Sequence, residues 1–307
     1  MTRTHPGMEE RAAWLRRDSE RVSGALPPLL VKAERLVSST FHGVHGRRRA
    51  GPGETFWQYR SAQPGDPLAM IDWRRSARSD RLFVREMEWE AAETVLLWAD
   101  RSRAMQVASR MARSKREGGT VSKAERASLL ALALGVLLSR GGERFGLIGT
   151  DAERPRTGER QLERLAFLLS QPPDENAPEY GAPSDYALPR AGRVVLISDF
   201  LGPTEAVLPA LRRAAGQGTG GVLLQVLDPV EEEFPFAGRT RFESLGGSLR
   251  HDTDEARALR EKYLHRLAER RDELAAMARG AAWQLMLHRT DESPRKPLRG
   301  LHAGLGG

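Results

Sequence analysis

Five short apolar runs, separated by segments with a helical pattern, place the strongest constraint on the fold of this chain. The runs are TVLLWAD from Thr94, RFGLIGT from Arg144, RVVLISDF from Arg193, GGVLLQVLD from Gly220 and AAWQLMLH from Ala281. Continuous apolar runs of this length are typical of strands buried on both faces of a parallel sheet. Helical segments of about 10 to 15 residues between strands are typical of parallel crossovers. We therefore predict an α/β fold, a doubly wound, mostly parallel sheet with helices on both faces.

The segments between the runs set the expected helices. They are 123–140, 159–170, 204–216 and a long helix over about 253–279, with a Pro-rich polar loop over 171–190. Outside this α/β region, which covers 93–289, the sequence changes character. Residues 1–25 are expected to be a flexible polar leader, and 26–92 form a charged segment that opens on a helix at its prolines. The polar residues 290–307 are expected to be a disordered tail.

The chain shows no sign of export or of membrane insertion. Its first residues lack the apolar stretch of a secretion signal. The longest apolar stretch, Ala127–Ser139, is too short to span a bilayer. The absence of cysteine excludes disulfides, a zinc ribbon and a thiol nucleophile. We expect a cytoplasmic protein without a membrane span.

The basic composition has two interpretations. The formal net charge is +7 and the sequence pI is about 10.2. Only five of the 48 basic residues are lysine, which favours a genomic preference for arginine codons over a selected phosphate-binding surface. Much of the charge also alternates in sign. Nucleic-acid binding through arginine-rich loops stays open as the alternative function.

Two of the predicted strands end on an acidic residue. Asp100 closes the run VLLWAD and Asp199 closes VVLISD, with Ser102 and Ser198 close by. If these strands are neighbours, both carboxylates project into one crevice beyond the carboxyl ends of the sheet, where such folds bind ligands. Carboxylate and hydroxyl oxygens are ligands that Mg²⁺ or Mn²⁺ prefers. The alternative is that each aspartate caps the following turn.

The block before the first run carries a family resemblance. The segment GRRRAGPGETFWQYRSAQPGDPLAMIDWRRSARSDRLFVREMEWE contains a Gly-rich basic loop followed in order by PGD, IDW, SAR and VRE. This order resembles the DUF58 family, over about residues 26 to 199. PGDP here replaces the more usual two acids after the glycine. The resemblance implies that a domain similar to von Willebrand factor A follows, with the strands ending at Asp100 and Asp199 side by side.

The metal motif of von Willebrand factor A domains gives the resemblance a candidate site. DRSRAM, which begins at Asp100, resembles the Asp-x-Ser-x-Ser of that motif, and LISDF resembles the segment that supplies its last aspartate. Thr157 in PRTGERQ is the best match to the motif's threonine. Ala104 stands where the second serine is expected, so one oxygen ligand is missing. The implied metal ligands are Asp100, Ser102, Thr157 and Asp199.

The charged segment supports two compatible roles. Arginine forms bidentate pairs with carboxylates, and such pairs hold a turn-rich segment together. The same groups also make a recognition surface for another protein. The candidate partner-binding residues are Arg47, Arg48, Arg49, Asp66, Asp72, Trp73, Arg78, Arg85 and Glu86.

Enzyme motifs are absent from the sequence. The chain has no GxxxxGK[ST] phosphate loop and no GxSxG elbow, and its seven histidines are scattered. A metal-assisted hydrolase lacks an evident general base beside the paired aspartates. Members of the resembled family are commonly encoded beside MoxR-type AAA+ ATPases. We therefore expect a non-enzymatic adaptor that works with such an ATPase in assembly or maturation of other proteins, through a degenerate metal ion-dependent adhesion site.

Overall fold

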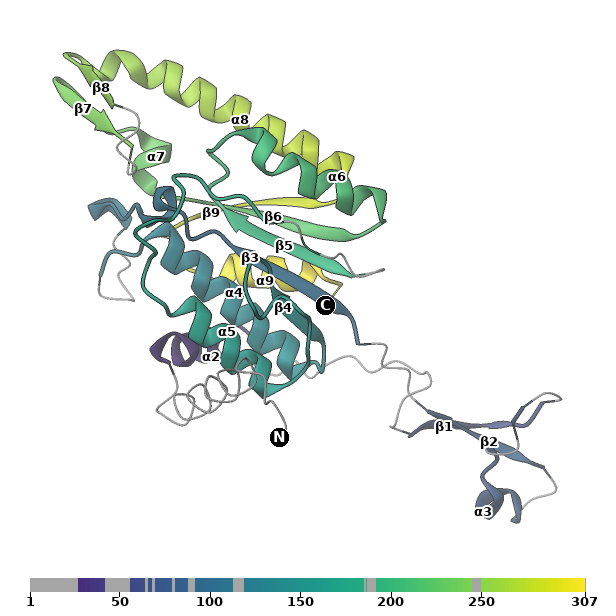
Figure 1. Cartoon of the computed structure of the whole chain (residues 1–307). Coiled ribbons are helices and arrows are strands. Elements are labelled where there is room, and N and C mark those ends of the chain that lie inside the picture. Colours follow the sequence, from purple (N-terminus) through teal and green to yellow (C-terminus); the bar gives the residue numbers. More distant parts are fainter. Residues whose placement is uncertain are drawn as a thin grey trace, which may run out of the picture. The chain divides into compact units, whose positions relative to one another are not determined.

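The computed structural model describes most of the chain as two compact units (Figure 1). The described residues are 27–41, 56–63, 66–67, 70–78, 81–87, 92–112, 119–184, 186, 192–244 and 250–306. The large unit combines Met1–His42 with Thr94–Gly307, and the small unit is Gly43–Glu93. The leader expected at 1–25 lies outside the described residues, as do Arg47, Arg48 and Arg49.

The five predicted apolar runs form one parallel sheet in the large unit. Its strands are β3 (Thr94–Ala99), β4 (Arg144–Leu147), β5 (Arg193–Ser198), β6 (Gly220–Leu227) and β9 (Gln284–Arg289). They are all parallel, in the order β4-β3-β5-β6-β9. The α/β class and the parallel sheet are thus confirmed. The strand order reverses once, because β4 and β5 lie on opposite sides of β3.

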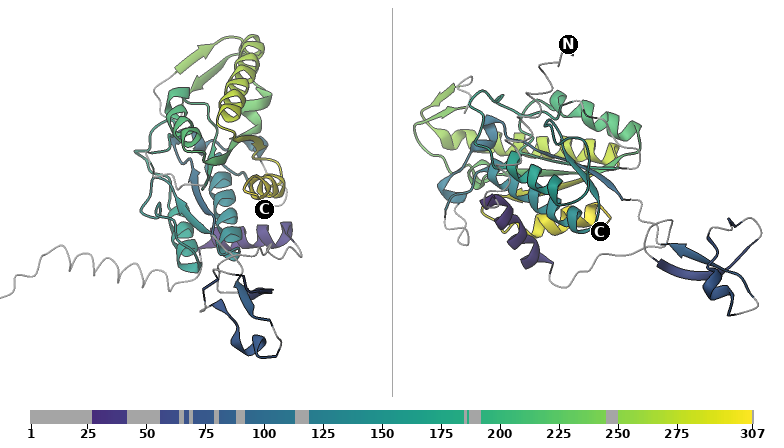
Figure 2. Two further views of the ribbon diagram at one scale, coloured as in Figure 1. Left: turned by 90° about the vertical axis from the view of Figure 1, so that its right-hand side faces the viewer. Right: turned by 60° about the horizontal axis from the view of Figure 1, so that its bottom comes forward.

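Helices cover both faces of this sheet (Figure 2). One face packs against α2 (Pro28–Thr40), α4 (Lys123–Arg140), α5 (Glu159–Leu169) and α9 (Arg295–Gly304). The other packs against α6 (Leu208–Gly216) and α8 (Arg260–Gly280). Successive side chains of a strand point to opposite faces, so Leu96 and Leu97 belong to different cores. This explains why the strands read as continuous apolar runs.

Helix α4 is the central helix of its layer. It begins with a reciprocal cap, in which Glu125 N donates to Ser122 Oγ at 3.1 Å and Ser122 N donates to Glu125 Oε2 at 2.8 Å. Its apolar residues surround the helix rather than forming one stripe, as expected of a helix that is buried all round. The sheet covers one side of α4, and α2, α5 and α9 pack on it as well. The predicted bounds 123–140 are those observed.

Both ends of the large unit differ from the expected division. Residues 290–307 were expected to be a disordered tail, but α9 lies there with Leu298 and Leu301 fully buried. Leu298, Leu301 and Leu305 recur at helical spacing, and this pattern outweighs the polar composition around them. Helix α2 packs against α4, so residues 27–41 belong to the large unit rather than to the charged segment.

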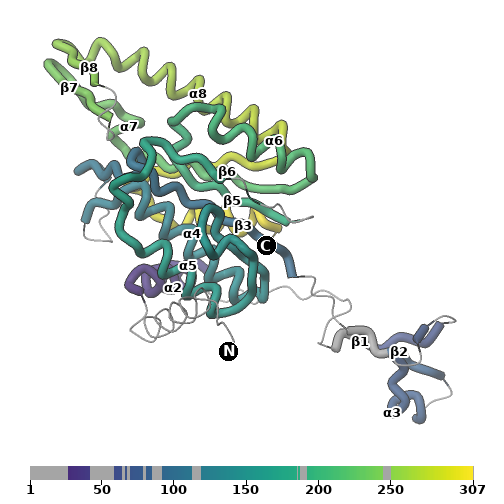
Figure 3. Tube along the Cα trace, in the orientation of Figure 1, coloured from purple at the N-terminus to yellow at the C-terminus, as the bar shows by residue number. Residues whose placement is uncertain are grey.

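The region before α8 also differs from the prediction. The long helix was expected from Thr253, but Thr253 pairs with Thr240 in a hairpin and α8 begins at Arg260. The hairpin strands are β7 (Thr240–Glu243) and β8 (Arg250–Thr253), and a short helix, α7 (Pro229–Glu233), precedes them. Phe234 stacks on Phe242 at a centroid distance of 5.5 Å and contacts the tilted ring of Tyr263 at 4.8 Å, so it joins the hairpin to α8. The chain trace through this region is visible in Figure 3.

The small unit is built around two antiparallel strands. They are β1 (Phe56–Ser61) and β2 (Phe83–Met87), with the short helix α3 (Trp73–Ser76) between them in sequence. The expected strand period over 82–89 is confirmed for β2. Ile71 and Val84 form a bridge and are buried. Among the described residues of the whole chain, no helix is long and apolar enough to cross a membrane.

Candidate functional site

The aspartates that follow β3 and β5 lie in one crevice. Ala99 pairs with Ile197 in parallel register, so Asp100 and Asp199 emerge at neighbouring positions on the carboxyl ends of the strands. Asp100 N donates to Ile197 O at 2.9 Å. Each aspartate is 2% exposed. The point at which the strand order reverses therefore carries two buried carboxylates, where folds of this class place their ligand sites.

Asp100 is engaged by the protein itself. Its Oδ1 accepts a hydrogen bond from Ser102 N at 2.8 Å, and its Oδ2 accepts one from Ser198 Oγ at 2.6 Å. Burial raises the pKa of Asp100, while these hydrogen bonds act in the opposite direction. Asp100 thus holds the turn at Ser102 in the manner of a capping residue.

Asp199 is paired with a buried lysine that the sequence reasoning missed. Asp199 Oδ2 lies 2.7 Å from Lys123 Nζ, and its Oδ1 accepts from Leu201 N at 3.0 Å. Lys123 is the first residue of α4 and is 1% exposed. Its Nζ also lies 2.5 Å from Glu231 Oε1, on α7. Burial lowers the pKa of Lys123, but the two carboxylates outweigh it and the net pKa is raised.

Thr157 does not join this crevice. It is exposed and follows Arg156, which forms a bridge with Phe145. Phe145 pairs with Val95, near the beginning of β3, whereas Asp100 follows the end of that strand. The assignment of Thr157 as a metal ligand is therefore wrong. It rested on sequence order, which did not show that the chain doubles back after β4.

A different segment closes the crevice, and we call residues 178–181 the cover segment. Arg103 N donates to Pro178 O at 3.0 Å, and Ala104 N donates to Glu179 O at 2.9 Å. A Cβ atom added at Gly181 would overlap the carboxylate of Asp100. The cavity left beside the two aspartates measures about 10 Å³, the space of about one water molecule. The cover segment belongs to the Pro-rich polar loop that the sequence predicts over 171–190.

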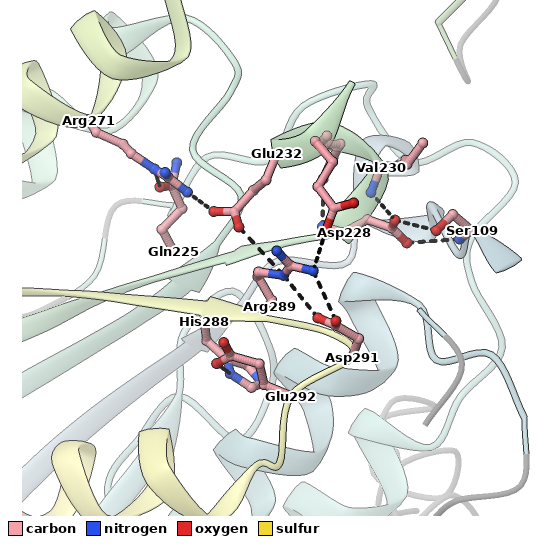
Figure 4. Close-up of polar contacts among 12 residues, drawn as sticks. Ser109, Gln225, Asp228, Val230, Glu232, Arg271, His288, Arg289, Asp291 and Glu292 are labelled. Atoms are coloured by element: carbon pink, nitrogen blue, oxygen red, sulfur yellow. Dashed lines mark hydrogen bonds and ion pairs between the residues drawn. The ribbon is translucent and has the colours of Figure 1, made fainter. Parts of the chain in front are cut away.

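The acidic helix α7 links this crevice to a network of ion pairs at the ends of β6 and β9 (Figure 4). Its three consecutive glutamates all have cationic partners. Glu231 contacts Lys123, Glu232 contacts Arg271 and Arg289, and Glu233 contacts Arg289 at 2.8 Å. The motif DPVEEE was the available sequence signal, because a run of acids directly after a buried strand needs cations near that strand's end.

Asp228, which directly precedes α7, anchors that helix. It is fully buried and accepts from Ser109 N at 2.8 Å and from Val230 N at 2.9 Å. Ser109 Oγ donates to it at 2.5 Å. Arg289 also contacts Asp291 at 3.0 Å. Figure 4 shows Asp228 turned toward Ser109 while Arg289 reaches Glu232 and Asp291. Ion pairs and hydrogen bonds thus connect the segments at the carboxyl ends of β5, β6 and β9.

These contacts do not fit a bound Mg²⁺ or Mn²⁺. Such ions need oxygen ligands directed at one point, but both oxygens of Asp100 and both of Asp199 already accept from protein donors. The ammonium of Lys123 lies where it would repel a cation held by Asp199. Ala104 offers no side-chain oxygen. Among the described residues, no group of three or more His, Cys, Asp or Glu could hold a metal.

In the small unit, two of the predicted partner-binding residues contribute to the fold. Asp66 forms two hydrogen bonds with Arg60, each 2.7 Å, and these lower its pKa to about 2. Asp72 caps α3 by accepting from Arg75 N at 2.9 Å, and it also accepts from Tyr59 Oη at 3.0 Å. The scaffold interpretation therefore holds for both aspartates.

The remaining predicted partner-binding residues fall into two groups. Trp73 is 57% exposed, and Arg78 is exposed as well. Arg85 and Glu86 lie on β2, where their backbones pair with Tyr59 and Gln58, and their side chains lie outside the described part of the chain.

Comparison with known proteins places the chain in a family. Proteins described as uncharacterized from Mycobacterium bovis and from two strains of Mycobacterium tuberculosis are each 27% identical to it over 288 residues, which is 89% of this chain and 86% of each relative. A crystal structure of an uncharacterized membrane spanning protein from Vibrio fischeri matches at 13% identity, covering 69% of this chain and 97% of that one, with a TM-score of 0.18. A TM-score this low does not show that the two chains share a fold. The profile of the family described as Protein of unknown function DUF58 matches residues 58–273. Because this match spans more than half of the sequence, the chain belongs to the DUF58 family.

Proposed function

We propose that this protein is a non-enzymatic interaction module, an adaptor that works with a MoxR-type AAA+ ATPase in the assembly or maturation of other proteins. The large unit is, in this proposal, a domain similar to von Willebrand factor A whose metal site has been lost. The ATPase supplies the nucleotide chemistry, because this sequence has no phosphate loop. The small unit supplies the contact surface.

One observation carries the proposal: exposed apolar side chains gather in the small unit. Five large apolar side chains are exposed among the described residues, and three of them, Met70, Trp73 and Leu82, lie in the small unit. The other two are Met111 and Leu287. The small unit is by far the shorter of the two, so this share is high. Concentrated exposed apolar groups mark interaction sites.

The three apolar residues flank one backbone junction. Asp72 N donates to Phe83 O at 2.9 Å. Met70 and Trp73 lie within two residues of Asp72, and Leu82 directly precedes Phe83. A second hydrogen bond, from Phe83 N to Ser76 Oγ at 2.9 Å, also holds this junction. We call Met70, Trp73 and Leu82 the apolar cluster.

Cationic groups surround the apolar cluster. Arg74, Arg75 and Arg78 are all exposed, and Arg75 lies over the ring of Tyr59 at 4.2 Å. Asp66 is paired with Arg60, whereas Asp72 accepts from the backbone N of Arg75 and from the hydroxyl of Tyr59. A surface of tryptophan and arginine is typical of binding hot spots. Its charge favours a partner with an acidic surface that also presents apolar groups.

The large unit supports the non-enzymatic interpretation. A hydrolase needs a cleft that holds both a substrate and an attacking water. The crevice beside Asp100 and Asp199 has room for about one water molecule, and its carboxylates are occupied by protein donors. Asp100 and Asp199, which would be the catalytic residues of a hydrolase, therefore have structural roles here.

The test is a binding measurement between the purified protein and the MoxR-type ATPase of the same genome, by biolayer interferometry. We expect Trp73→Ala to weaken binding about 30-fold, since loss of a hot-spot side chain costs about 2 kcal/mol. Leu287→Ala is the matched control, because Leu287 is similarly exposed on the large unit. Equal binding by the wild type and Trp73→Ala would contradict the proposed surface.

The same preparation tests the alternative of nucleic-acid binding. A phosphate-binding surface would retain RNA or DNA during purification, and its affinity would fall steeply between low and moderate salt. We expect binding of the ATPase to survive moderate salt, because the apolar cluster contributes part of the contact. Retained nucleic acid together with no binding of the ATPase would overturn the proposal.

A further inference from the structure

The buried lysine at the start of α4 occupies a position that opposes its charge. Lys123 is the first residue of the helix, where the free N–H groups make the helix end positive and favour anions. Its side chain is 1% exposed, so water does not solvate the ammonium. A buried charge of this kind persists only when opposite charges offset the loss of solvation.

Two carboxylates supply that compensation from different parts of the chain. Asp199 Oδ2 and Glu231 Oε1 lie 2.7 and 2.5 Å from Lys123 Nζ. They are 76 and 108 residues away in sequence. The ammonium therefore joins the beginning of α4, the end of β5 and the helix α7 at one point.

Each carboxylate uses its other oxygen to fix a turn. Asp199 Oδ1 accepts from Leu201 N at 3.0 Å, which holds the chain as it leaves β5. Glu231 Oε2 accepts from Asp228 N at 2.8 Å, which closes the reciprocal cap of α7. A cation between two such carboxylates performs the structural task that a metal ion performs in other proteins, because it draws together acids from separate segments.

We infer that the ammonium of Lys123 is a built-in cation that takes the place of a divalent metal in this crevice. The acids of the crevice then hold the sheet edge together without Mg²⁺ or Mn²⁺, rather than bind a metal-linked partner. This inference concerns the chain's own stability and metal affinity, so it does not rest on the proposed function. The inference rests on the contacts of Asp199: its two carboxylate oxygens, which the metal motif would direct at a metal ion, instead contact Lys123 Nζ and Leu201 N.

A pair of lysine variants tests the inference. Lys123→Ala removes the cation and leaves space between Asp199 and Glu231, whereas Lys123→Met removes the charge and keeps a side chain of similar length. We expect both to lower Tm by about 10 °C, as is typical when a buried ion pair loses one partner in a unit of this size. Added Mn²⁺ should restore Tm in Lys123→Ala only, because the methionine stem fills the space.

Three controls make the result specific. Lys262→Ala, an exposed lysine on α8, should leave Tm unchanged with or without Mn²⁺. The double variant Lys123→Ala/Asp199→Asn should lose the rescue. The wild type should show no shift in Tm between 5 mM EDTA and about 5 mM Mn²⁺, since a ligand that does not bind the native state does not stabilise it.

A direct titration decides the question even if Lys123→Ala fails to fold. Mn²⁺ binding to the wild-type protein, followed by electron paramagnetic resonance of the free ion, should show no saturable site up to about 1 mM Mn²⁺. Saturable binding of one Mn²⁺ that is lost in Asp199→Asn would overturn the inference. A destabilised Lys123→Ala that folds but gains nothing from Mn²⁺ or Mg²⁺ would also overturn it.

Discussion

The large and small units use charged residues in opposite ways. At the carboxyl edge of the large unit, the acids Asp199 and Glu231 are paired with Lys123, and both Asp199 and Lys123 are almost fully buried. In the small unit, arginines such as Arg74 and Arg78 stand exposed beside an exposed tryptophan. The segment that resembles the metal motif is thus closed by the protein's own contacts, and the contact surface that we propose lies in the charged small unit. Burial and partners, rather than residue type, distinguish the two.

The largest effect is expected from unpairing the buried charge. Asp199→Ala leaves Lys123 with one of its two carboxylates, which should lower the free energy of unfolding by about 3 to 5 kcal/mol. Urea unfolding measures this change. Asp254→Ala, at an exposed ion pair of the same unit, is the control and should have little effect. Equal losses of stability in the two variants would show that the ion pair of Asp199 is no more shielded from water than an exposed ion pair.

The next effect concerns the fit of the cover segment. Gly181→Ala places a Cβ against the carboxylate of Asp100 and should lower the free energy of unfolding by about 1 to 3 kcal/mol, as overpacking does. Gly280→Ala, where a Cβ meets open space at the end of α8, is the matched substitution. It should be neutral or stabilising, because alanine favours a helix over glycine. Equal tolerance of both would mean that the cover segment does not seal the crevice.

A pH effect of intermediate size is expected from His288 on β9. Burial, with Arg126 and Lys296 nearby, lowers its pKa to about 3, and Glu292 is the acid that approaches it, at 3.9 Å. Below pH 6.5 the unfolded chain binds a proton that the folded chain does not. Stability should therefore be present above pH 6.5 and fall with decreasing pH toward 3, by about 1.4 kcal/mol per unit.

The variant His288→Gln checks this pH dependence. Urea unfolding at pH 7.5 and pH 5.5 should show a smaller loss of stability in His288→Gln than in the wild type. His265→Gln removes an exposed histidine on α8 and should keep the wild-type loss. An unchanged loss in His288→Gln would mean that water reaches His288 and that this edge is open.

The smallest effect on stability is expected where the effect on binding is largest. Trp73→Ala should change the free energy of unfolding by less than about 0.5 kcal/mol, because the side chain is mostly exposed. Its binding to the ATPase should nevertheless be weakened about 30-fold, as proposed above. Parallel thermal unfolding and binding measurements separate the two. A loss of stability as large as that in Asp199→Ala would assign Trp73 to the scaffold.

The sequence predicted most of the sheet because its signal was local. The runs from Thr94, Arg193 and Gly220 are buried on both faces, so each consists of consecutive apolar residues. The observed start of α4 also has a local cause, because the neighbouring Ser122 caps the helix. Helix α9 was missed because its two buried leucines, Leu298 and Leu301, lie among polar residues, and composition was given more weight than spacing.

The site was predicted less well because its contacts are not local. The positions of Asp100 and Asp199 followed from strand ends, but Lys123 opens a helix, where an exposed side chain is the usual expectation. Its partners lie on distant segments, and no spacing in the sequence reveals them. Thr157 was misplaced for the complementary reason: order along the chain did not show that it lies toward the other end of the sheet.

The most direct test of the account is hydrogen–deuterium exchange of the protein with and without its MoxR-type ATPase. The account predicts protection by the ATPase in peptides covering 70–78 and 81–87 of the small unit. Exchange at Asp100–Ala104, at the cover segment 178–181 and at Asp199–Pro203 should stay unchanged, because that crevice is already closed. Protection at the crevice, with none in the small unit, would contradict the central claim.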